Sequence, residues 1–167
     1  MANKTIMNLI EVTPTLSTGA YAVGDVMFVP TEIPNFFPDL KTTAEIKSLT
    51  IIDRGQDSPV MQVYLTNDGR TTGTINETAD ADDTVMDGIQ CMIPVIASDY
   101  IGGSAFTDDC NIANITSRLP GDNLNSGIGT IVDGNRSTSL YIFGILGGGA
   151  KTFAATDLTF KIGVKYH

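Results

Sequence analysis

Hydrophobic side chains recur along this chain with the period of two that is typical of β-strands. Residues 58–68 alternate in this way, and further short candidates lie at 110–119 and 126–134. In residues 158–165 the apolar set is Leu158, Phe160, Ile162 and Val164, and the alternating set is Thr159, Lys161, Gly163 and Lys165. About eight or nine such segments are separated by turn-forming residues. The pattern predicts an all-β fold, an antiparallel, jelly-roll-like β-sandwich with at most one short helix.

Two pairs of predicted strands lie close enough in sequence to form hairpins. Residues 44–55 and 58–68 flank a short polar turn in which Gly55 is free to adopt a positive φ. Residues 140–146 and 158–164 flank a glycine cluster, which predicts a closing hairpin. The segment 140–146 is apolar at both parities, so we expect it at the centre of a sheet or at a subunit interface.

Prolines limit two other segments, because proline cannot donate to a strand ladder. Pro30 is expected to end a short strand that begins near residue 25, and Pro94 places the segment 89–98 at a sheet edge or a bulge. The one stretch that could form helical turns is 79–88.

The first residues have a mixed pattern. Residues 3–12 fit a first strand or an arm that adds to the sheet of a partner. We therefore divide the chain into an N-terminal arm or first strand at 1–18 and a single β-sandwich domain at 19–167. A domain of this length can bury a sizeable core without metals or disulfides.

Three prolines surround two adjacent aromatic residues in the segment 30–40, Phe36 and Phe37. The prolines favour an irregular, extended loop. Two neighbouring aromatic side chains are not both expected to face one core. One reading is that one ring fills the end of the sandwich, and the alternative is that the other ring meets a neighbouring subunit. A loop stiffened by proline binds at low entropic cost.

The chain has a formal net charge of −9, from 19 acidic and 10 basic residues in 167. No sequence window gathers the lysines and arginines, so nucleic acid and anionic membranes are disfavoured as partners. No run approaches the ~20 apolar residues of a membrane helix, and the N-terminus lacks the pattern of a signal peptide. These features predict a soluble protein that is made in the cytoplasm.

Few residues have the chemistry of a catalytic or metal site. His167 is the only histidine and the last residue, which disfavours nucleophilic catalysis and a zinc site. The acidic run that begins at Asp80 lacks the glycine and glutamate of a calcium loop. Cys91 and Cys110 are expected to be free thiols rather than a disulfide. We expect no enzyme activity and no cofactor.

Four segments together resemble a group of small structural proteins of tailed bacteriophages: "GAYAVGDVM", "SLTIIDRGQDSPVMQVYLTND", "DADDTVMDGIQCMIPV" and "SLYIFGILGGGAKTFAATDLTFKIGV". The similarity spans roughly residues 19–165 and consists of strands and turns, including a Tyr-x-x-Gly-Asp turn at Tyr21, Gly24 and Asp25. The tract 67–77 departs from the group, because it is more polar than the aromatic strand end expected there.

The resemblance implies a capsid decoration, or cement, protein with a β-sandwich fold. It further implies a homotrimer on the outer capsid surface in the virion, with the major capsid protein as partner. The candidate subunit interface combines the N-terminal arm, the proline-rich loop and the strand that is apolar on both faces; its residues are Ile6, Leu9, Ile10, Phe36, Phe37, Tyr141 and Phe143. Other readings are a fibre or receptor-binding head domain, or a glycan- or calcium-binding β-sandwich module.

Overall fold

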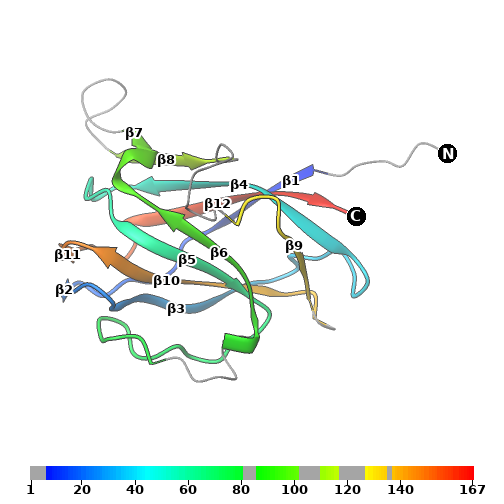
Figure 1. Cartoon of the computed structure of the whole chain (residues 1–167), viewed down its shortest axis with the longest axis horizontal. Coiled ribbons are helices and arrows are strands. Elements are labelled where there is room, and N and C mark those ends of the chain that lie inside the picture. Colours follow the sequence, from blue (N-terminus) through cyan, green and yellow to red (C-terminus); the bar gives the residue numbers. More distant parts are fainter. Residues whose placement is uncertain (1–6, 81–85, 102–109, 117–126, 135–136) are drawn as a thin grey trace.

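In the computed structural model of the chain, two antiparallel sheets face one another across one hydrophobic core (Figure 1). The structure describes residues 7–80, 86–101, 110–116, 127–134 and 137–167. The predicted all-β sandwich is confirmed. The helical turns expected at 79–88 fall largely on residues 81–85, outside the described residues.

The first sheet has six strands. Its order is β1-β12-β4-β8-β7, and β9 pairs with β4 beside β8. The bounds are β1 (Met7–Val12), β12 (Leu158–Tyr166), β4 (Thr43–Asp53), β8 (Asn111–Ile115), β7 (Tyr100–Ile101) and β9 (Ile131–Asp133). The first strand expected within 3–12 is therefore present at 7–12, and it pairs within its own chain.

The second sheet has four strands in the order β3-β10-β5-β6. They are β3 (Val26–Ile33), β10 (Leu140–Gly148), β5 (Val60–Thr66) and β6 (Ile89–Val95). A separate ribbon joins β2 (Ala20–Tyr21) to β11 (Lys151–Thr152), and one 3-10 turn, η1, spans Ala97–Asp99.

The eight longer strands follow the topology of a jelly roll. In chain order they are β1, β3, β4, β5, β6, β8, β10 and β12. The first pairs with the last, the second with the seventh, the third with the sixth and the fourth with the fifth. Nested pairing of this kind is that of one long antiparallel hairpin rolled into a two-sheet sandwich, which is the jelly-roll arrangement.

Both predicted hairpins are wrong. β4 and β5 belong to different sheets, and so do β10 and β12. The short turn after Asp53 crosses from one sheet to the other, so β4 and β5 face each other through their buried side chains instead of sharing backbone hydrogen bonds. The central position expected for β10 is confirmed, because β10 lies between β3 and β5.

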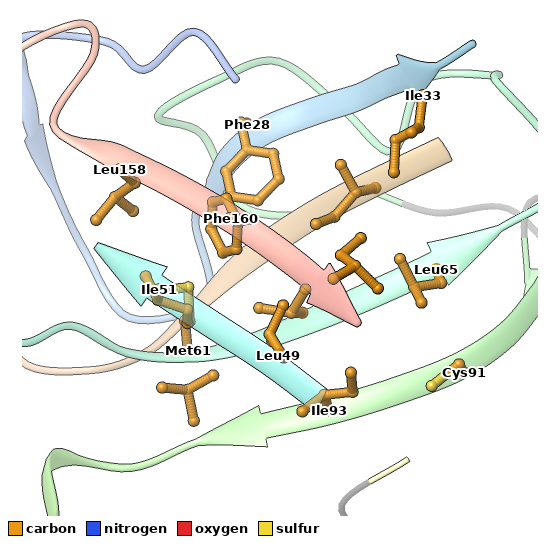
Figure 2. Close-up of a cluster of buried hydrophobic side chains, with 14 of the residues drawn as sticks. Phe28, Ile33, Leu49, Ile51, Met61, Leu65, Cys91, Ile93, Leu158 and Phe160 are labelled. Atoms are coloured by element: carbon orange, nitrogen blue, oxygen red, sulfur yellow. The ribbon is translucent and has the colours of Figure 1, made fainter. Parts of the chain in front are cut away.

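The core lies between the two sheets and is built from the inward-facing positions of each strand. The four apolar residues of β12 are all buried, as their alternation predicted. The rings of Phe28 on β3 and Phe160 on β12 meet across the core at 5.2 Å between centroids. Figure 2 shows these rings beside Leu49 and Ile51 of β4 and the side chains of β5 and β6.

Prolines mark both edges of the four-stranded sheet. Pro94 lies in the edge strand β6, as predicted. Pro30 does not end its strand, because β3 continues to Ile33. β3 is also an edge strand, where a missing backbone donor costs little.

Candidate interaction surface

The outer face of the six-stranded sheet carries the best candidate for an interaction surface. We call it the open face. Its positions alternate along the strands with residues that point toward the core, except at the irregularity in β4 that includes Lys47, and the strand register places them in rows across the sheet. The open face consists of Met7, Leu9, Glu11, Lys161, Gly163, Lys165, Glu45, Lys47, Ser48, Thr50, Ile52, Ile101, Ile112, Asn114, Ile131 and Asp133.

Exposed hydrophobic side chains are concentrated on the open face. Nine large hydrophobic residues are exposed in the described part of the chain, and five of them lie here. Their exposed fractions are Met7 69%, Leu9 60%, Ile101 67%, Ile112 39% and Ile131 60%. Exposed apolar residues that gather on one face of a soluble protein indicate an interaction site.

Three isoleucines form a continuous apolar row at one end of this face. Ile101 of β7 pairs with Ile112 of β8, which pairs with Ile52 of β4. Residues directly opposite on neighbouring strands have side chains in contact range. The three side chains therefore make one strip across β7, β8 and β4.

The open face is electrically different from the rest of the molecule. It carries equal numbers of lysines and acids, so its formal charge is zero in a chain of net charge −9. The charged residues are Lys47, Lys161, Lys165, Glu11, Glu45 and Asp133. Among the described residues, the excess negative charge therefore lies away from the open face, and the open face is where another acidic protein surface meets the least repulsion.

Glu45 has three basic residues as neighbours. It bonds to Lys47, lies 3.4 Å from His167 Nε2 and is opposite Lys165 in the register. The hydrogen bond from Lys47 is the main cause that lowers the pKa of the Glu45 carboxyl, with His167 and Lys165 adding to it. Nearer the edge, Lys161 Nζ lies 3.2 Å from Glu11 Oε2.

The segment 67–80 packs on the β3 and β10 part of the four-stranded sheet. The Asn76 N–H donates to the Val26 carbonyl at 2.9 Å, and the Val26 N–H donates to the Glu77 carbonyl at 2.9 Å. Gly69 lies so close to the ring of Tyr141 that an added Cβ would be 2.7 Å from Cε1. This polar tract therefore packs against β3 and β10 of its own chain.

Phe36 and Phe37 do not divide between core and surface. Both are buried, at 0% and 1% exposed, and their rings meet edge to face at 4.9 Å. The expectation that one of them faces outward is wrong. Asn35 has a φ of 54°, so the chain turns just before the two rings and is not extended there. The Tyr166 hydroxyl donates to the Phe36 carbonyl at 2.6 Å and anchors the loop.

The two aromatic candidates on β10 also lie within the molecule. Phe143 is 1% exposed and stacks on Tyr64 at 4.7 Å between centroids. Tyr141 is half-buried beneath Gly69. The strand is apolar on both faces because one face packs in the core and the other packs beneath the chain's own loop.

Of the N-terminal candidates, Leu9 alone lies on the open face. Ile10 points inward, is half-buried and packs against the core. Ile6 lies outside the described residues. The predicted interface residues are thus not brought together into one surface.

Sequence reasoning missed most of the open face. Ile112 alternates with buried residues in β8, a pattern visible in the sequence. Its neighbours Ile52 and Ile101 are distant along the chain, so only the strand register brings the strip together. The same holds for Lys47 and Lys165, which lie on different strands.

One buried carboxyl lies where β4 ends. Asp53 is fully buried; its Oδ2 accepts the Ser58 N–H at 2.6 Å, and its Oδ1 has no hydrogen-bond partner. Burial raises the pKa of this carboxyl, and the nearby charge of Asp57 adds to the shift. The Asn111 amide, from the neighbouring strand β8, donates to the Ser58 hydroxyl at 2.8 Å. Asp53 is therefore part of the packing of the β4–β5 turn.

Metal-ligating and thiol groups are dispersed. Among the described residues, no three His, Cys, Asp or Glu side chains converge as metal ligands would. Within the same residues, no helix has the length and hydrophobicity to cross a membrane. Cys91 and Cys110 are not joined in a disulfide, and burial raises the pKa of Cys91 to about 11.

Comparison with solved structures gives distant likenesses, among them two to structures of one virus. No protein-family model matches the chain, and no curated protein matches its sequence. A crystal structure of the infectious bursal disease virus VP2 subviral particle matches at 10% identity and a TM-score of 0.32, over 98% of this chain and 41% of that chain. A structure of the Gx strain of the same virus matches at 11% identity and a TM-score of 0.22, over 98% and 40%. This chain thus spans about two fifths of the chains it matches, and likeness at these TM-scores defines neither fold nor function.

Proposed function

We propose that this chain is a structural protein of a virus particle, specifically a capsid decoration protein. It binds the outer surface of the shell, as a homotrimer, and bridges major capsid subunits through the open face. The observation that carries the proposal is the gathering of five of the nine exposed large hydrophobic residues on one formally neutral face.

The distribution of charge supports this orientation. With the open face against the shell, the acidic remainder of the described molecule faces solvent. Binding to the assembled shell alone would stabilise it by mass action. Jelly rolls occur in viral capsid and lectin domains, so the fold is compatible with this role and does not select it alone.

Two variants of similar exposure on opposite sheets test the proposal. Ile112 on the open face is 39% exposed, and Met92 on the outer side of β6 is 37% exposed. Ile112→Asp should weaken binding to shells of the encoding virus that lack this chain by about tenfold or more, since a buried unpaired charge costs at least ~1.4 kcal/mol. Met92→Asp should bind like the natural protein.

Co-sedimentation of each variant with the shells measures the effect, and thermal melting confirms that both variants fold. Equal loss in the two variants would reject the open face as the contact. An absence of binding by the natural protein would reject the decoration role.

A further inference from the structure

The edges of the two sheets are not equally protected. In the four-stranded sheet, edge strands β3 and β6 each contain a proline, and β3 is also bridged to the segment 75–78. In the six-stranded sheet, β7 is two residues long. The Gln90 amide bonds to both the N–H and the carbonyl of Asp133, which occupies backbone groups of β9. Short strands, prolines and covering groups are the usual means of blocking an edge.

β1 is less protected, although one backbone group on its edge, the Leu9 N–H, is capped by the side chain of Asn8. It is a six-residue edge strand without proline, and it pairs with β12 in a regular register without a bulge. Both its outward-facing apolar residues, Met7 and Leu9, are more than half exposed. Among the strand edges that the structure describes, this one alone is long, flat and apolar.

The outer backbone groups of β1 point away from β12, toward the position that another strand would take. The Leu9 N–H donates to Asn8 Oδ1 at 2.9 Å, so it points away from β12. Backbone groups of alternate residues point to the same side of an antiparallel strand, so those of Met7 and Glu11 also lie on the open edge. Asn8 Oδ1 therefore accepts the Leu9 N–H where the backbone carbonyl of a neighbouring strand would otherwise accept it.

We propose that the β1 edge accepts an extended segment of the shell protein as an added strand. This inference rests on the proposed function, and the edge is continuous with the open face, so one partner can contact both. Main-chain bonds to an edge strand supply affinity in this mode, and alternate side chains supply specificity.

The residues around the edge define the chemistry of the segment. An apolar residue opposite Leu9 would cover its exposed side chain, and apolar residues on the inner side would cover the half-buried Ile10 and Val12. An acidic residue opposite Met7 would lie within side-chain reach of Lys165, which is the partner of Met7 on β12. The segment is therefore an alternating apolar strand with an acid at one end.

A second copy of the chain fits this edge less well. A pair of six-residue strands is small beside the ~1,000 Å² that a stable interface needs. Two molecules of formal charge −9 also repel each other. A shell segment avoids both difficulties, because the open face adds contact area.

Two substitutions at one position separate the backbone contribution from the side chain. Leu9→Ala removes the side chain and keeps the N–H, whereas Leu9→Pro removes both and leaves the ladder with β12 intact, since that N–H is not part of it. Shells of the encoding virus lacking this chain are the binding probe. Leu9→Pro should bind about tenfold more weakly than Leu9→Ala, from one lost main-chain bond and an unpaired acceptor.

Hydrogen exchange on the natural protein gives the same answer without a substitution and covers the case in which Leu9→Pro fails to fold. The Leu9 and Glu11 amides should become protected when shells are added. Binding without this protection, or equal affinities of the two variants, would overturn the added strand and leave the decoration role standing. No binding at all would overturn both. Protection already present in the free protein, with a dimer seen by light scattering, would assign the edge to a second copy and overturn the shell segment.

Discussion

The two outer faces of this sandwich differ in how they treat their apolar residues. On the four-stranded sheet, Phe143 points outward from β10 and yet is 1% exposed; it stacks on Tyr64, and the chain's own segment 67–80 packs on the same strand at Tyr141. On the six-stranded sheet, Leu9 and Ile112 also point outward and remain exposed. An outward apolar residue of β10 therefore belongs to the fold, whereas one on the six-stranded sheet is available for a partner.

The largest effect should come from removing an apolar side chain from each face in turn. Phe143→Ala should lower the free energy of unfolding by about 3–5 kcal/mol, as for a buried aromatic residue. Leu9→Ala should change it by less than about 0.5 kcal/mol, because its side chain is already in water. Urea denaturation measures both values. Similar losses in the two variants would contradict the distinction between the faces.

The contact between the covering segment and β10 can be tested at Gly69. A methyl group there would lie 2.7 Å from the Tyr141 ring, so Gly69→Ala should cost about 1–3 kcal/mol. Gly147, where an added Cβ would have its nearest neighbour at 3.5 Å, is the matched control. Gly147→Ala should stay within about 0.5 kcal/mol. If Gly69→Ala were as stable as the control, the segment would not be packed on this face.

A smaller effect on stability should depend on pH and come from Asp53, the buried carboxyl at the end of β4. The folded protein raises the pKa of Asp53 above its ordinary value of 3.8, so folding favours the protonated form. The contribution of this carboxyl to stability is therefore fully present below that ordinary value and is lost as the pH rises through the raised pKa. Natural protein and Asp53→Asn, compared by denaturation from pH 3 upward, should show the natural protein losing stability relative to the variant. A flat difference would place Asp53 in water.

The smallest effect should come from the ion pair at the edge of the open face. Lys161 and Glu11 have side chains 32% and 59% exposed. Exposed pairs are worth at most about 1 kcal/mol, so Glu11→Gln should change the free energy of unfolding by less than about 0.5 kcal/mol. Repeating the denaturation in 1 M salt should remove even that difference. A large loss of unfolding free energy that persists in 1 M salt would show that this face contributes substantially to folding stability.

Local patterns in the sequence were enough to predict the strands, and not enough to predict their partners. The alternation of Leu158, Phe160 and Ile162 identified β12 and its buried side correctly. The position of β12 beside β1 and β4 could not be read from its proximity to β10, because a short connection serves equally well to cross between sheets.

The candidate site was less predictable, since it depends on contacts between distant residues. A turn at Asn35, which has no glycine to announce it, directs both Phe36 and Phe37 into the core. Tyr141 is half-buried beneath a polar tract that its composition alone marks as solvent-exposed loop. Leu9 was predicted correctly as an exposed residue. It lies on an edge strand, so its exposure does not depend on how distant segments pack.

The pairing of β1 with β12 also constrains how the molecule forms. Met7 lies opposite Lys165, so the two strands that meet are separated by almost the whole chain. β12 must therefore be synthesised before β1 can pair with it, so β1 stays without this partner while the strands between them are made. Contacts this distant in sequence make folding slow. During this time the open edge of β1, which we propose binds a partner in the folded protein, can also associate with the wrong chain.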